Sequence, residues 1–214
     1  MTTASPAKKP IIETGERQVR TLVVKELRTV KEGETRKIVG YAAVFNSNSE
    51  DLGGWVERIA PGAFAKVLRE KQDVRCLFNH DSNKVLGRTS SGTLKLEEDT
   101  KGLRFECTPP DTNEARDVIT LIDRGDVNQC SFSFRTAYPG GVEWIYPDYP
   151  EPAIRTVKEV ETLYDVGPVS FPAYNETEVG LRSIDEALAN RPPKQNDAST
   201  AARIRLAEAE VENG

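Results

Sequence analysis

Short runs of β-branched and aromatic residues, separated by polar turns, recur along most of the chain. Residues 19–24 and 37–45 are two such runs, and the charged segment 31–36 between them contains a glycine typical of a turn. We therefore expect these two runs to pair as a β-hairpin. Further short strands are expected at residues 55–59, 74–78, 85–89, 93–96, 103–107, 129–137, 142–145 and 154–166.

Two segments show helical spacing of their apolar residues instead. The first follows Pro61 and covers residues 62–68, and the second extends from a cap at Thr112 or Asn113 through Asp123. Many short strands combined with few helices predict a β-rich fold, either a barrel or a sandwich, into which the helices are inserted.

The ends of the chain differ from its centre. Residues 1–18 are polar and carry two prolines, which predicts a disordered N-terminal arm, and residues 184–214 predict a flexible or weakly helical tail. The hydrophobic share of 37% lies below the roughly 45–50% of globular domains, which fits unpacked ends. One folded domain is expected over residues 19–183.

Charge and hydropathy narrow the class of partner. The formal net charge is −5 and no long run of Lys or Arg occurs, so the chain is expected to repel nucleic acid. No window approaches the ~18 apolar residues of a membrane span, and the first twenty residues lack the apolar centre of a signal peptide. We therefore expect a soluble protein that binds neither nucleic acid nor membrane.

The residues that bind metals and cofactors are scarce. The three cysteines, Cys76, Cys107 and Cys130, show no CxxC spacing, and the chain has one histidine. Because zinc needs three or four such ligands, a zinc site is not expected, and the odd cysteine count argues against a disulfide framework. No glycine-rich phosphate loop occurs either. The sequence thus predicts no metal and no cofactor.

Nucleophilic catalysis remains open, because it needs only a nucleophile, a base and an orienting acid. His80, in the segment CLFNHD, is the one available imidazole, although composition alone favours a simple polar residue at a strand end. In the segment CSFSFR, strand alternation places Ser131 and Ser133 on the face opposite Cys130 and the phenylalanines. A half-buried strand without any function gives the same pattern.

Asp165 is a carboxylate within the apolar run LYDVG. Burying a charge is costly unless it is paired, so a partner such as an imidazole N–H is one interpretation, and a surface-facing side chain is the other.

These segments occur in a characteristic order. Together they closely resemble the prohead serine protease family of tailed bacteriophages, over about residues 20–182. The segments that carry the resemblance are GYAAVFN (40–46), WVERIAPGAF (55–64), CLFNHD (76–81), VLGRT (85–89), SFSFR (131–135) and LYDVGPVSFPAY (163–174).

The resemblance implies a fold, an activity and a setting. The family is thought to share the assemblin-type β-barrel of herpesviruses, closed or partly closed. Its members cleave segments of the capsid or scaffold protein inside the immature capsid, in the host cytoplasm. A serine endopeptidase without cofactor is therefore expected, which cleaves capsid or scaffold protein and its own chain. Association of the chain with copies of itself is left open.

The resemblance also assigns residues. The family histidine falls on His80, the nucleophilic serine on Ser131 and the acid on Asp165. Ser133 stands where the family often has Gly or Ala, so it remains an alternative nucleophile. Asp165 stands where a glutamate is more common, so Glu159 and Glu161 remain alternative acids.

Other functions compete with this interpretation. A cysteine peptidase would use Cys130 or Cys76 with His80, and a non-catalytic capsid assembly or scaffold-binding module would keep the barrel alone. The donors that stabilise an oxyanion are undecided between Arg88, Arg135 and backbone N–H groups.

Overall fold

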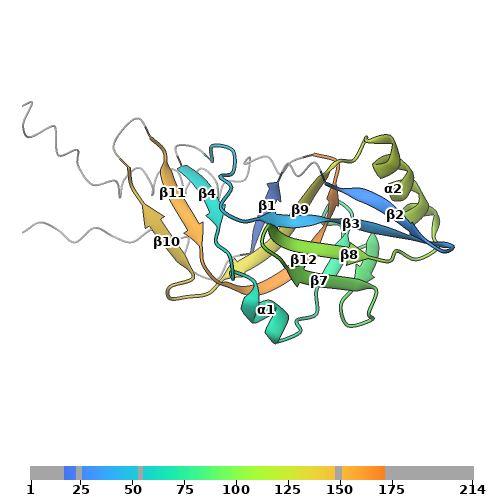
Figure 1. Ribbon diagram of the computed structural model, residues 1–214, viewed down its shortest axis with the longest axis horizontal. Helices are drawn as coiled ribbons and strands as arrows, with labels where there is room; N and C mark the ends of the chain where they lie inside the picture. Colours follow the sequence, from blue (N-terminus) through green and yellow to red (C-terminus); the bar gives the residue numbers. More distant parts are fainter. Residues whose placement is uncertain (1–16, 23–25, 53–54, 148–150, 172–214) are drawn as a thin grey trace, which may run out of the picture.

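The computed structural model describes residues 17–22, 26–52, 55–147 and 151–171 (Figure 1). The predicted tail, and the predicted arm up to residue 16, lie outside these ranges. The elements in chain order are β1 (Gln18–Leu22), β2 (Arg28–Glu32), β3 (Thr35–Val44), β4 (Trp55–Ile59), α1 (Ala65–Arg69), β5 (Arg75–Leu77), β6 (Val85–Arg88), β7 (Leu94–Glu98), β8 (Gly102–Cys107), α2 (Asn113–Arg124), β9 (Gln129–Thr136), β10 (Val142–Ile145), β11 (Ala153–Val157) and β12 (Val160–Val169).

The described strands form three sheets, and the β-rich prediction is confirmed. The first sheet has the order β1-β9-β12-β5-β6, the second β10-β11-β4 and the third β2-β3-β8-β7. Figure 1 shows β4, β10 and β11 at one end of the molecule and α2 at the other. Most pairs are antiparallel, but β12 runs parallel to β5 and β11 runs parallel to β4. The strand expected over residues 154–166 is divided between β11 and β12, which belong to different sheets.

The predicted hairpin of residues 19–24 with residues 37–45 is wrong. β3 pairs with β2, and Gly33, with a φ of 62°, lies in the turn between them. β2 is mostly exposed, so it lacks the apolar pattern by which the sequence reveals a strand. β1 pairs with β9 instead, more than 100 residues away along the chain. Strand patterns show that a segment is extended, but they do not show which strand it pairs with.

A single large core lies between the first and third sheets and the two helices. β9 contributes Phe132 and Phe134 to it, which stack on each other, and Phe64 packs edge-on against Phe132. The predicted helix α2 is confirmed: the Thr112 side chain accepts a hydrogen bond from a first-turn N–H, and Gly125 ends the helix with a φ of 83°. This core holds β9 firmly from one side.

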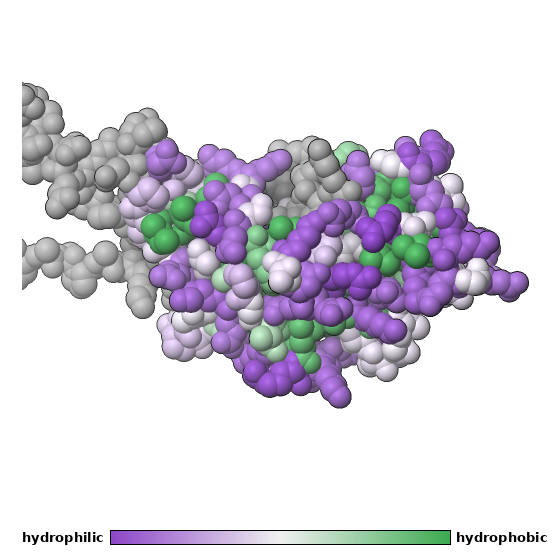
Figure 2. Space-filling view, in the orientation of Figure 1, coloured by the Kyte–Doolittle hydropathy of each residue, from purple (hydrophilic) through white to green (hydrophobic). Residues whose placement is uncertain are grey.

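One face of the molecule is mainly polar (Figure 2). The face in Figure 2 is largely hydrophilic, and its hydrophobic areas are small and separate from one another. Among the described residues, no helix combines the length and the apolar character that crossing a membrane requires.

Candidate active site

The imidazole of His80 contacts both Ser131 and Asp165. Nε2 of His80 is 2.6 Å from Oγ of Ser131, and Nδ1 of His80 is hydrogen-bonded to Oδ1 of Asp165. Ser131 lies on β9, Asp165 on β12, and His80 follows β5. Because β9, β12 and β5 are consecutive in the first sheet, three segments that are distant in sequence converge at one place.

The register between β12 and β9 fixes the positions of Asp165, Ser131 and Ser133 along the sheet. Asp165 is opposite Ser133 on β9, and Gly167 is opposite Ser131. β5 then approaches β12 closely, since a Cβ added to Gly167 would lie 2.0 Å from the carbonyl oxygen of Leu77. Glycine at this position therefore allows the strand that leads to His80 to lie directly against the strand that carries Asp165.

The loop that presents His80 has an uncommon backbone. Asn79 and His80 have φ values of 55° and 58°, a region in which Asn and His are more frequent than most residues. Asn79 holds the loop, because its N–H donates to the Pro168 carbonyl at 3.1 Å and its side-chain oxygen accepts from the Ser170 N–H at 2.8 Å. The Asp81 carboxylate accepts from the Asn83 N–H at 2.9 Å and closes the following turn.

Asp165 is 1% exposed and well partnered. Besides His80, it accepts hydrogen bonds from the Ser133 hydroxyl and from Nη2 of Arg17, at 2.5 Å for the latter. Burial alone would raise the pKa of Asp165, but the hydrogen bonds from His80 and Ser133, with the charges of His80 and Arg17, lower it on balance. The carboxylate is therefore ionised at neutral pH, where it is hydrogen-bonded to the imidazole.

Ser133 shares a strand face with Ser131 but has other partners. Its hydroxyl donates to Asp165 and accepts from Nε and Nη2 of Arg17, at 3.1 and 2.9 Å. Both serines are fully buried. The sequence correctly placed them on one face, but that face is not open, because Arg17 and the Arg20 carbonyl contact the two hydroxyls.

The two alternative acids contact other groups. Glu159 lies 3.8 Å from the Lys66 ammonium, and Glu161 lies 3.1 Å from the guanidinium of Arg135. In the described part of the chain, the carboxylate that contacts His80 is that of Asp165.

The arginines considered as oxyanion donors are also engaged elsewhere. Arg88 forms an ion pair with Asp73, with Nε 2.8 Å from the carboxylate, and Arg135 pairs with Glu161. Neither guanidinium has a hydrogen bond to His80 or Ser131.

The cysteines lie in the core. Cys76, Cys107 and Cys130 are fully buried, and burial raises the pKa of the Cys130 thiol to about 12. The pKa of Cys76 is also raised, through a hydrogen bond with Cys107 and through burial. Because the thiolate is the nucleophile in cysteine peptidases, these environments disfavour that alternative. The described residues contain no group of three metal-binding side chains.

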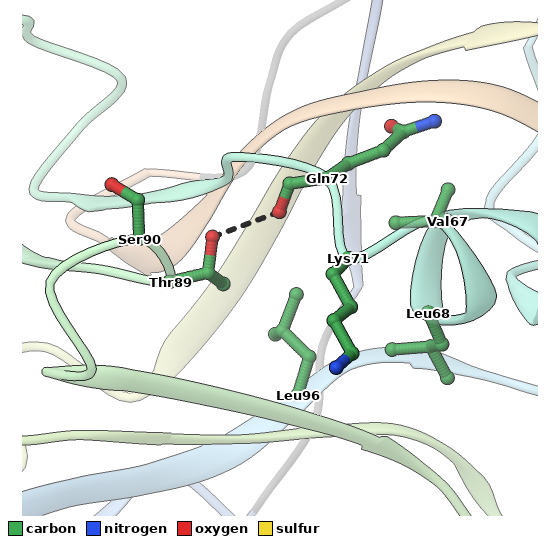
Figure 3. Close-up of a pocket in the computed structure, with 7 residues that line it drawn as sticks. All are labelled: Val67, Leu68, Lys71, Gln72, Thr89, Ser90 and Leu96. Atoms are coloured by element: carbon green, nitrogen blue, oxygen red, sulfur yellow. Dashed lines mark hydrogen bonds between the residues drawn. The ribbon is translucent and has the colours of Figure 1, made fainter.

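The structure also has a hollow of about 390 Å³ that is separate from His80, Ser131 and Asp165 (Figure 3). The hydroxyl of Thr89 donates to the Gln72 carbonyl at 2.8 Å at its edge. Val67, Leu68 and Leu96 give it an apolar wall, and none of His80, Ser131 and Asp165 lines it.

The family described as Caudovirus prohead serine protease matches residues 22–190 of the chain. The chain belongs to this family. It is a serine protease of bacteriophage capsid maturation, which confirms the resemblance stated from the sequence.

Other comparisons add little to the family match. Among the curated proteins, none matches the chain. One similar solved structure is the capsid assembly protease gp21 of bacteriophage T4, with a TM-score of 0.43 and 11% sequence identity, covering 73% of this chain and 98% of that chain.

In the prohead protease, the sequence did not predict two neighbours of Asp165 and Ser131. Arg17 was assigned to a disordered arm, and Arg20 to a hairpin strand. Their contacts with Asp165 and Ser131 depend on the pairing of β1 with β9, for which the sequence carries no local signal.

Proposed function

We propose that the prohead protease cleaves peptide bonds with Ser131 as nucleophile, His80 as general base and Asp165 as the acid that orients the imidazole. The observation that carries this proposal is the continuous line of contacts from Ser131 Oγ through both ring nitrogens of His80 to Asp165. A triad is recognised by such geometry and not by the order of its members in the chain.

Each member has one task. His80 takes the hydroxyl proton while Ser131 Oγ bonds to the substrate carbonyl carbon, and it later gives the proton to the leaving amine. Asp165 keeps the imidazole in the tautomer whose Nε2 accepts, and it stabilises the positive charge that forms on the ring. The acyl-enzyme is then hydrolysed by water, activated by the same imidazole.

Ser133 is proposed to support Asp165 and not to attack the substrate. Its hydroxyl donates to Oδ2 of Asp165, while His80 contacts Oδ1 of that carboxylate and Ser131 contacts the other ring nitrogen of His80. Ser131→Ala and Ser133→Ala therefore form a matched pair of variants on one strand.

Co-expression with the phage's own capsid protein tests this assignment. We expect Ser131→Ala and His80→Ala each to lower processing about 10⁴-fold or more, and Ser133→Ala to lower it far less. Product masses and initial rates give the readout, and circular dichroism checks that each variant is folded. A Ser133→Ala loss larger than that of Ser131→Ala would move the nucleophile by two residues.

The finer features of the fold and setting are also proposals. We propose that the first and third sheets wrap their shared core as a partly closed, assemblin-like barrel, which their common hydrophobic cluster supports. The protease domain would span residues 19–183, close to the matched range of 22–190. It would act inside the prohead, within the host cell, on capsid or scaffold segments that are enclosed with it.

A further inference from the structure

The backbone of β1 lies against the proposed nucleophile. Oγ of Ser131 lies 2.8 Å from the carbonyl oxygen of Arg20, and Thr21 is opposite Ser131 in the antiparallel register of β1 with β9. The peptide group that joins Arg20 to Thr21 is therefore the one that contacts the hydroxyl. A substrate strand that adds to the edge of β9 would place its own scissile peptide in the same position.

The side chain of Arg20 forms an ion pair with the buried carboxylate of Glu57. Nε and Nη2 of Arg20 lie 2.7 and 3.3 Å from the two carboxylate oxygens of Glu57 on β4, a two-point contact that suits a guanidinium. Glu57 is 3% exposed. The guanidinium carbon also lies 6.0 Å from the ring centre of Trp55, within reach of a cation–π contact.

Glu57 is held in place without Arg20. Arg155, on the neighbouring strand β11 and fully buried, donates to the second oxygen of Glu57. Burial opposes the charge of Glu57, but Arg20 and Arg155 together lower its pKa. Because Arg155 stays when a guest arginine leaves, the carboxylate keeps a partner and remains ready to receive the next cation.

We propose that Glu57 selects substrates with arginine or lysine on the acyl side of the cleaved bond, and that β1 is the first such substrate, cut between Arg20 and Thr21. This inference rests on the assignment of Ser131 and His80 proposed above. It names the substrate class for that site: basic residues presented by an extended strand.

The reaction at β1 follows ordinary peptide hydrolysis. Ser131 Oγ bonds to the Arg20 carbonyl carbon, the bond from that carbon to the Thr21 nitrogen breaks, and His80 delivers the proton to the departing amine. Water then cleaves the ester and leaves a carboxylate on Arg20. Release of residues 1–20 removes Arg17 from Asp165 and frees the part of the β9 edge opposite Gln18–Arg20, from Phe132 to Phe134, for a strand of another protein.

The test uses the purified full chain and two peptides that span residues 15–26, one with the natural Arg20 and one with Gln in its place. Wild type is expected to acquire Thr21 as its N-terminal residue, and Ser131→Ala is expected to keep its full mass. Arg20→Lys should still be processed at this bond, whereas Arg20→Gln should not. The arginine peptide should be cleaved at least about 100-fold faster, in kcat/KM, than the glutamine peptide.

Glu57→Gln supplies the enzyme side of the experiment. It should reduce the preference for the arginine peptide toward unity while cleavage of the glutamine peptide persists. This variant also removes the negative charge that pairs with the buried guanidinium of Arg155, so it could disturb the fold. The comparison of the two peptides on wild-type enzyme is therefore the second, independent measurement.

The outcomes separate the two proposals. If wild type processes capsid protein in a Ser131-dependent way but cleaves both peptides equally, the basic specificity is overturned. If it processes capsid protein but retains residues 1–20, the cut in β1 is overturned. In both cases the proposed function stands. If neither capsid protein nor peptide is cleaved, both proposals fail. Retention of residues 1–20 with capsid processing would make β1 a permanent edge strand.

Discussion

The side-chain oxygen of Asn79 accepts a hydrogen bond from the backbone N–H of Ser170 over 2.8 Å. This contact ties the loop that presents His80 to the end of β12, the strand that carries Asp165. The base and the acid of the proposed triad are therefore joined twice, once through their own hydrogen bond and once through the residue that precedes the histidine. Asn79 acts as a positioning residue.

Asn79→Ala should lower kcat about 10- to 100-fold with little change in KM, because a small displacement of His80 costs catalysis more than binding. Asn79→Asp keeps an acceptor for the Ser170 N–H and should recover most of the lost rate. Steady-state kinetics on the arginine peptide measure both values. A rise in KM at constant kcat would contradict a positioning role.

The acid sensitivity of folding should depend on Asp165. Its pKa in the folded protein lies below the value of about 3.9 for an unfolded chain, so its stabilising contribution is complete above that pH and is lost as the pH falls through the folded value. In the Ser131→Ala background, Asp165→Asn should therefore destabilise the fold most near neutral pH, and the difference should shrink below about pH 4. Urea unfolding at several pH values measures this, and a difference that grows on acidification would contradict it.

Gly167→Ala should destabilise the protein by about 1–3 kcal/mol or more, because the added Cβ would meet the backbone of Leu77, which cannot yield as a flexible side chain can. Gly62→Ala is the control: its φ is also positive, at 84°, but no atom lies within 4 Å of the new Cβ, so its cost should stay near 1–2 kcal/mol. Urea unfolding in the Ser131→Ala background compares the two. Equal losses would show that crowding against β5 is unimportant.

Iodoacetamide should leave the folded protease active and unmodified. The three thiols are fully buried, and the raised pKa values of Cys76 and Cys130 keep them protonated at neutral pH. Intact-mass measurement should show alkylation only after unfolding in urea, which serves as the positive control. Rapid loss of activity with one alkylated cysteine would restore the cysteine peptidase as a candidate.

The sequence by itself determined the extended character of the chain and the residues that carry its chemistry. Alternation along residues 130–135 placed Ser131 and Ser133 on one face of a strand, because side chains of a strand point to opposite sides in turn. The cap at Thr112 and the glycine at 125 fixed the helix α2 for equally local reasons. The ordered motifs then indicated the family, which the family match confirmed.

Only the tertiary structure decided which groups meet. The choice between Ser131 and Ser133, and between Asp165 and Glu161, depends on the register of β12 with β9, and a shift of register leaves local sequence patterns unchanged. The sequence likewise could not predict the neighbours of β1, because the paired strands β1 and β9 are more than 100 residues apart in the chain. That long-range pairing brings Arg20 to Glu57 and to Ser131, and no local pattern encodes it.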